Sequence, residues 1–239
     1  IHQAVEAQED VEITFATNQA ARITIQDMFL RYQRLAGMTG TASTSRRELS
    51  KIYEVNVSEI PTNRPPIRKK LPSMVLGTAD KKWAAIVEDA YEQHQLNRPV
   101  LIGTRSIDKS EHLAKLGDGV KEIGGLHVIC SELHEAKRID RQLIGRCGRQ
   151  GDPGTFRQFF ALDDEILLYG LGPKKAARLE AQGAKANGPL NRLEYLFHKA
   201  QRRVERRHFR DRKVMLYHEK ERQKVQRQMG QDPYLDTPG

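Results

Sequence analysis

The sequence predicts an α/β fold in which helices cover a parallel sheet. Three short apolar runs, at residues 99–103 (PVLIG), 126–130 (LHVIC) and about 156–162, have the length and composition of buried strands. Segments with helical patterns lie between them. Strands that alternate with helices typically form a parallel sheet with both faces covered, so we expect this architecture here.

The first 70 residues predict a helix, a strand and an extended connector. Apolar side chains recur at helical spacing up to residue 35, which predicts a helix that ends near Gly37. The Gly- and Thr-rich run at 36–42 (AGMTGTA) favours a strand followed by a tight loop. Three prolines at the start of residues 61–70 require an extended connector, which we interpret as a boundary between two lobes.

Three helices are predicted before and between the apolar runs, and the one at 106–113 is short. Residues 79–95 place five apolar side chains at the spacing of an amphipathic helix, and Trp83 is expected in the core. These side chains are Trp83, Ile86, Val87, Ala90 and Tyr91. A polar helix is expected over 134–143, with His134 orienting it rather than performing acid/base chemistry.

The C-terminal third predicts a change of character after Gly170. Residues 173–188 are rich in Gly, Ala and Lys, which is typical of a mobile linker. From Leu190 onward apolar residues recur at helical spacing among many basic ones, which predicts a long basic helix or helical hairpin. The run at 232–239 (DPYLDTPG) is expected to be an unstructured end.

Charge and cysteine content limit the classes of function. The chain has 239 residues and a formal net charge of +9, and from Arg192 to Arg227 there are 13 Lys or Arg against 5 Asp or Glu. This basic region suits polyanions such as nucleic acid, anionic lipid or nucleotide phosphates. Cys130 and Cys147 are the only cysteines, so neither a zinc site nor a disulfide framework is indicated, and a reducing cytosol is expected. No apolar run reaches the roughly 18 residues of a membrane span, and a chain that begins with Ile is expected to be a fragment.

Residues 142–154 (QLIGRCGRQGDPG) carry the most informative motif. Arg146 and Arg149 are three residues apart, which predicts that their guanidinium groups lie on one side of a helical turn. The neighbouring Gly145 and Gly148 allow a ligand or another lobe to approach the backbone closely. Two guanidinium groups can stabilise the charge on a transferred γ-phosphoryl group. A helix end with solvated arginines explains a generic GRxGR equally well.

This run resembles the last motif of helicase-type motors, Q-x-x-G-R-x-G-R-x-G, and other strings narrow the resemblance to the SecA family. These strings are HQAVEA near the start, TGTA at 39–42, IPTNRP at 60–65, GGLHVI at 124–129 and HEAKRID at 134–140. The resemblance covers about residues 1–170. It implies a RecA-like parallel-sheet lobe of the P-loop NTPase type, the helicase-type second lobe, with flanking long helices. It also implies an ATP-driven preprotein translocase with ATP bound between two such lobes.

The resemblance further implies a role for each site residue. The coupling motif, which relays the nucleotide state, would be Thr39, Gly40 and Thr41, although TGTA alone is more often an ordinary loop. Arg146 and Arg149 would be the catalytic, phosphate-sensing arginines. The nucleotide contacts would be Gln150, Asp152, Gly145 and Gly148. Asp152 would accept hydrogen bonds from hydroxyl or amino groups of the nucleotide, although an Asp before Pro is also an ordinary turn residue.

The same resemblance implies a domain plan and two missing parts. Residues 1–60 would end the first nucleotide-binding lobe, 61–172 would form the second, and 173–239 would be a linker and a basic, scaffold-like helical segment. The sequence has no G-x-x-x-x-G-K-[ST] loop and no acidic Mg²⁺ motif. ATP and Mg²⁺ are therefore expected to be held mainly by a first lobe ahead of Ile1, and the chain alone is expected to be inactive. The family has further elements where Lys115 meets Leu116 here, so we expect residues to be missing at this junction.

Preprotein substrate and a membrane protein-conducting channel are the implied partners, with anionic lipid and a second copy of the chain as further candidates. The implied location is the cytoplasm, peripherally at the inner face of the cell membrane. Two alternatives stay open, a noncatalytic binding or regulatory module and a nucleic-acid helicase lobe. Nucleic acid is disfavoured because the basic residues lack interleaved aromatic side chains for base stacking.

Overall fold

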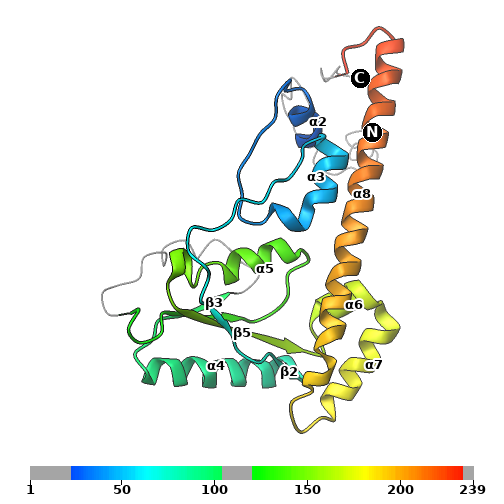
Figure 1. Cartoon of the computed structure of the whole chain (residues 1–239). Coiled ribbons are helices and arrows are strands. Elements are labelled where there is room, and N and C mark those ends of the chain that lie inside the picture. Colours follow the sequence, from blue (N-terminus) through cyan, green and yellow to red (C-terminus); the bar gives the residue numbers. More distant parts are fainter. Residues whose placement is uncertain (1–22, 104–119, 234–239) are drawn as a thin grey trace, which may run out of the picture. The chain divides into compact units, whose positions relative to one another are not determined.

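The computed structural model describes residues 23–103 and 120–233, which form two compact units. The larger unit, residues 36–211, contains the sheet and the helices around it (Figure 1). The smaller unit combines residues 23–35 with residues 212–233. One long helix, α8 (Glu194–Gln228), contributes to both units.

The sheet of the larger unit is parallel throughout. Its strands are β1 (Lys69–Lys70), β2 (Met74–Leu76), β3 (Val100–Gly103), β4 (Leu126–Cys130) and β5 (Gly154–Ala161). Their order is β1-β5-β4-β3, and β2 also pairs with β5. The predicted α/β class with a parallel sheet is therefore confirmed, as are the three strands predicted from the apolar runs.

Two helices cover opposite faces of this sheet (Figure 1). On one face, Val128 of β4 lies in an apolar cluster to which α5 (Lys137–Ile144) contributes Leu143 and Ile144. On the other face, Ile129 of β4 packs with Ile86 of α4 (Ala79–Gln95). Because successive strand residues point to opposite faces, one five-residue strand supplies both clusters.

Helix α4 has the predicted bounds but a different buried face. Thr78 caps its N-terminus by accepting a hydrogen bond from the backbone N–H of Lys81. The buried side chains of α4 are Lys82, Ile86, Asp89 and Gln93. Trp83 is 44% exposed, so the expectation that it lies in the core is wrong. The polar side chains can be buried because they find partners, as in the ion pair of Lys82 with Asp164.

A second apolar core lies at the carboxyl end of β5. Helices α6 (Glu165–Leu171) and α7 (Pro173–Ala184) and the first turns of α8 pack there, and Phe160 stacks on Phe197 with ring centroids 4.8 Å apart. Leu179 of α7 is buried in this core. The expectation of a mobile linker over 173–188 is therefore wrong for α7, because a helix with a buried apolar side chain is fixed by tertiary packing.

The N-terminal part of the larger unit is helical rather than extended. A turn leads into the 3-10 helix η1 (Ala42–Ser45) and then into α3 (Arg46–Tyr53). No strand forms within residues 36–42, so that prediction is wrong. The connector over 61–68 is non-helical, as predicted, and ends in β1.

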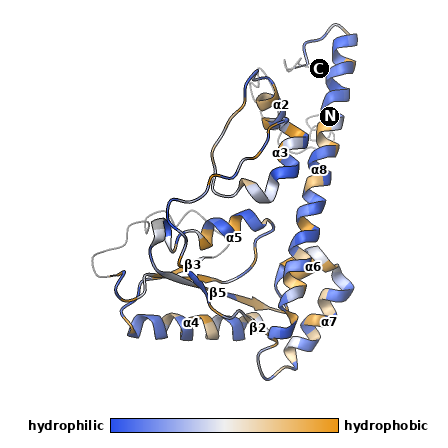
Figure 2. Ribbon diagram, viewed as in Figure 1, coloured by the Kyte–Doolittle hydropathy of each residue, from blue (hydrophilic) through white to orange (hydrophobic). Residues whose placement is uncertain are grey.

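In the smaller unit, α2 (Ile25–Leu30) is capped by Thr24 and ends at Leu30, so the prediction of an end near Gly37 is wrong. The long basic helix is confirmed as α8, and most of its length is hydrophilic (Figure 2). Predictions for 1–22, the helix at 106–113, the junction at 115 and 116 and the tail beyond 233 fall outside the described residues. Within the described ranges, no helix is both long and apolar enough to cross a membrane.

Candidate functional site

The arginine loop, defined as residues 145–152, follows the end of α5. Gly145 is the C-cap of α5, and Gly148 and Gly151 have positive φ angles of 63° and 79°. Gly148 in the left-handed region ends the helical path before Arg149, which opens a short 3-10 turn, η3 (Arg149–Gly151). The prediction that Arg146 and Arg149 share one helical turn is therefore wrong.

The two arginines of this loop differ in environment. Arg149 is exposed, and its Nε donates a hydrogen bond of 3.3 Å to the carbonyl oxygen of Gly145. Arg146 is half-buried, and its backbone N–H bonds to Leu143 at 3.0 Å. Arg149 thus occupies an acceptor at the C-terminal end of α5, where cations are favoured. An anionic oxygen is a stronger acceptor than this carbonyl, so Arg149 can exchange one for the other.

The connector supplies two further arginines that the sequence interpretation missed. A Cβ on Gly148 would lie 2.8 Å from Cβ of Arg68, and one on Gly151 would lie 3.0 Å from Cβ of Arg64. Nη1 of Arg68 donates a long hydrogen bond of 3.4 Å to the carbonyl of Cys147. The glycines predicted that some segment approaches this loop. Only the pairing of β1 with β5 identifies the connector as that segment.

Asp152, at the end of the loop, is held by an ion pair that was also missed. Its Oδ1 lies 2.9 Å from Nζ of Lys121, and its backbone N–H bonds to the carbonyl of Arg149 at 2.9 Å. Lys121 lies in a turn just before β4. No local pattern links Lys121 to Asp152 in the sequence. The side chain of Gln150 lies outside the described part of the structure.

The TGT motif forms a tight turn before η1. The hydroxyls of Thr39 and Thr41 lie 3.3 Å apart, with Gly40 between them, and the backbone N–H of Thr41 donates to Thr39 Oγ1. The next residues reach α5, because Arg141 Nη1 donates a hydrogen bond of 3.1 Å to Oγ of Ser43. The structure thus links this motif to the helix that carries the arginine loop, through a pair of side chains that the sequence did not single out.

The other end of α5 is anchored by buried polar contacts. The backbone N–H and Nδ1 of His134 lie 3.0 and 2.8 Å from Oδ1 of Asp140, and Gln201 of α8 donates to Oδ2 of the same carboxylate. Glu205 of α8 accepts a hydrogen bond from the backbone N–H of Lys137. The helix predicted over 134–143 begins at Lys137, so His134 lies just before α5 and contacts Asp140 in its first turns. The arginine loop is therefore connected through α5 to the N-terminal half of α8.

The donor set of this site fits phosphate better than a metal ion. Arginine side chains surround the loop, whereas the described ranges contain no group of three His, Cys, Asp or Glu side chains able to hold a metal. Both cysteines are buried, and burial raises the pKa of Cys130 to about 12 and that of Cys147 above its usual value. They are neutral thiols near neutral pH.

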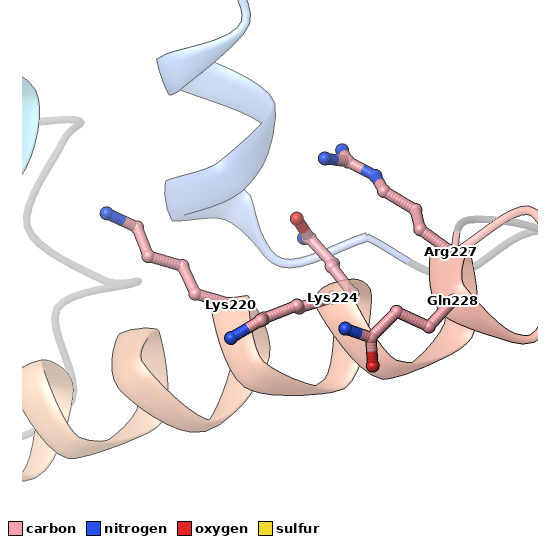
Figure 3. Close-up of a pocket in the computed structure, with 5 residues that line it drawn as sticks. Lys220, Lys224, Arg227 and Gln228 are labelled. Atoms are coloured by element: carbon pink, nitrogen blue, oxygen red, sulfur yellow. The ribbon is translucent and has the colours of Figure 1, made fainter.

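Helix α8 carries two basic pockets, one in each unit. In the larger unit a pocket of about 690 Å³ includes four arginines of α8 and the end of α6. These arginines are Arg203, Arg206, Arg207 and Arg210. In the smaller unit a pocket of about 430 Å³ is lined by Lys220, Lys224 and Arg227 together with two glutamines (Figure 3). Such clusters suit anionic groups, although solvation alone also satisfies exposed basic side chains.

Comparison with known proteins relates both parts of the chain to one family. Residues 65–118 and 116–185 match the SecA P-loop domain, and residues 1–50 match the SecA DEAD-like domain. Protein translocase subunit SecA 2 of Rhodopirellula baltica is 52% identical over 285 aligned residues, covering 100% of this chain and 43% of that protein.

Relatives of lower identity are also named SecA proteins. Protein translocase subunit SecA of Caldicellulosiruptor saccharolyticus is 39% identical over 90% of this chain and 31% of its own length. Protein translocase subunit SecA 2 of Clostridioides difficile is 36% identical over 90% of this chain and 35% of its own length. The chain thus spans less than half the length of these relatives. Two domains of the SecA family match this chain in order, and SecA 2 of Rhodopirellula baltica is 52% identical over 100% of this chain. The chain therefore belongs to the SecA family.

Proposed function

We propose that this chain is part of a protein translocase motor that couples ATP hydrolysis to the movement of preproteins through a membrane channel. Its relatives are named protein translocase subunits, which supports this activity for the whole protein. The observation that carries the proposal is the arginine loop, whose Arg149 lies exposed at the end of a helix that α8 anchors. This part of the protein supplies the arginine side of a nucleotide site.

In this proposal the nucleotide is ATP, and the chain contacts it without holding the metal ion. Arg146 and Arg149 bind phosphate oxygens, and Asp152 accepts hydrogen bonds from the nucleotide with Gln150 beside it. Gly145 and Gly148 allow the close approach. Mg²⁺ and the phosphate loop belong to a first lobe outside this sequence, so the chain by itself does not hydrolyse ATP. In this proposal residues 1–60 end the first lobe, residues 61–172 form the second lobe, and residues 173–239 add helices of a scaffold.

The coupling step in this proposal uses the contact between the TGT motif and α5. Binding of phosphate by Arg149 frees the Gly145 carbonyl at one end of α5. Arg141, one turn earlier, connects to Ser43 next to Thr39, Gly40 and Thr41. A shift of α5 is therefore transmitted to the turn before η1. The partners are a preprotein and a membrane channel, with the basic pockets of α8 as contacts for anionic lipid at the cytoplasmic face of the membrane.

The test of this function is Arg149→Ala in the full-length protein. An arginine that stabilises charge on the transferred phosphoryl group acts mainly in the transition state. We expect the ATPase kcat to fall about 10³-fold, with nucleotide affinity reduced much less. Steady-state hydrolysis and equilibrium nucleotide binding measure the two effects separately.

Arg138→Ala is the matched control, because Arg138 is an exposed arginine on α5 outside the loop. It should leave hydrolysis unchanged. Normal hydrolysis by the Arg149 variant would show that Arg149 does not stabilise charge on the transferred phosphoryl group. A full-length protein that binds nucleotide without hydrolysing it would instead support a noncatalytic regulatory module.

A further inference from the structure

The ion pair between Lys121 and Asp152 joins the turn before β4 to the end of the arginine loop. Oδ1 of Asp152 lies 2.9 Å from Nζ of Lys121. The Asp152 side chain is 23% exposed and that of Lys121 is 58% exposed. Both side chains are therefore partly accessible to a ligand, and a carboxylate that pairs through Oδ1 can still accept a hydrogen bond through Oδ2.

The turn that carries Lys121 is fixed by Arg98. Gly124 and Gly125 have φ angles of 97° and 72°, and their backbone N–H groups bond back to Lys121 and Val120. Arg98 donates hydrogen bonds to both glycine carbonyls, at 3.0 Å for Gly124 and 3.3 Å for Gly125. Nη1 of Arg98 also donates a hydrogen bond to Oε1 of Gln93 in α4. The three nitrogen atoms of one planar guanidinium therefore connect the turn to α4.

The segment that follows Asp152 is fixed by the same arginine. Nη2 of Arg98 donates to Oγ1 of Thr155 at 2.8 Å. A Cβ on Gly125 would lie 2.0 Å from the carbonyl oxygen of Pro153, so the turn and this segment touch through their backbones. Arg98 therefore connects the two chain segments by hydrogen bonds, and Lys121 of one segment faces Asp152 of the other.

We propose that Lys121 is a positioning residue for nucleotide. It holds Oδ1 of Asp152 so that Oδ2 accepts a hydrogen bond from a hydroxyl or amino group of the bound nucleotide. This inference rests on the proposed function, and it adds the residue that orients the nucleotide-binding carboxylate. The acceptor is oriented before binding, so less conformational freedom is lost on binding.

The experiment measures binding of ADP to the full-length protein by calorimetry, because ADP carries the hydroxyl and amino groups without hydrolysis. Lys121→Met should weaken ADP binding about fivefold, the upper range for an exposed ion pair. Lys121→Arg preserves the pair and should restore affinity to within about twofold. Lys69→Met removes the same charge from an exposed strand position and should leave affinity unchanged.

A double-mutant cycle shows whether Lys121 acts through Asp152. In an Asp152→Asn background, Lys121→Met should have no further effect, because the carboxylate it orients is gone. Equal affinities for Lys121→Met and Lys69→Met would overturn the proposal. Tighter binding by Lys121→Met would also overturn it, because Lys121 would then compete with nucleotide for Asp152.

Failure of the proposed function has a different signature. Normal hydrolysis by Arg149→Ala contradicts the catalytic role of the arginine loop but leaves the ADP affinities of the Lys121 variants interpretable. A full-length protein that binds no ADP overturns both proposals.

Discussion

Asp89 illustrates how single residues stabilise the larger unit. Its side chain is 2% exposed and accepts hydrogen bonds from His127 Nε2 at 2.9 Å and Arg157 Nη1 at 2.6 Å. His127 Nδ1 lies 2.6 Å from Oγ1 of Thr155, which already accepts from Arg98. An ionised carboxylate only accepts hydrogen bonds, so the ring nitrogen Nε2 carries a proton toward Asp89.

Removal of the Asp89 carboxylate should destabilise the protein strongly. Asp89→Ala leaves the Arg157 charge and the His127 N–H without their acceptor inside the protein. We expect the free energy of unfolding to fall by about 3 kcal/mol, measured by urea denaturation. The adjacent Glu88→Ala changes an exposed carboxylate on the same helix and should cost little. Equal effects of both variants would show that the network contributes nothing specific.

Two variable positions of the arginine motif, Ile144 and Cys147, are explained by packing. Both pack in the apolar cluster between α5 and the sheet, and the Cys147 thiol donates to the carbonyl of Ile144 at 3.2 Å. These two side chains therefore attach the start of the arginine loop to the apolar cluster beneath α5.

Among the elements, α7 depends on a contact between two glycines. A Cβ on Gly183 would lie 2.0 Å from the carbonyl oxygen of Gly77, and one on Gly77 would lie 2.1 Å from the carbonyl oxygen of Gly183. The backbone of α7 therefore touches the turn between β2 and α4 directly. The Gly, Ala and Lys content of this segment predicts a mobile linker. Small residues permit either a mobile linker or a close approach, and only the second is compatible with this geometry.

Gly183→Ala should therefore destabilise the protein although alanine favours helices. The helix-propensity gain of about 1 kcal/mol is outweighed by overpacking against Gly77, and we expect a net loss of about 2 kcal/mol in urea denaturation. Gly188→Ala is the control, because its Cβ would meet nothing within 4 Å. A stabilised Gly183 variant would mean that α7 moves away from Gly77 without cost.

Helix α4 shows the limit of periodicity at the same scale. Its bounds could be predicted because Thr78 caps it and its pattern is helical. The choice of buried face could not, since Lys82, Asp89 and Gln93 are buried with partners from α6, β4 and the turn beside β3. A prediction from periodicity places the apolar face of a helix in the core. It fails for α4 because the polar side chains on its buried face have hydrogen-bond partners inside the protein.

For the whole molecule, the comparisons bear on the junction of Lys115 and Leu116. The P-loop domain matches as two segments, 65–118 and 116–185, and the alignment to the Rhodopirellula baltica relative runs over 285 residues although this chain has 239. We expect the natural protein to contain a further stretch at this junction. Intact-mass spectrometry should give a mass above 27.3 kDa, with peptides from that stretch. A mass equal to that value would contradict this expectation and favour a truncated module.

The sequence by itself determined the three strands β3, β4 and β5, the basic helix α8, the extended connector and the family, because apolar runs, prolines and motif spacing are local features. It missed the short strands β1 and β2, which form only by pairing with β5. Tertiary structure alone decided which residues join the arginine loop. Arg64, Arg68, Lys121 and Ser43 reach it, or the helix before it, from segments far apart in the sequence. Parallel strand pairing and glycine contacts bring these segments together, and such long-range packing leaves no periodic trace in the sequence.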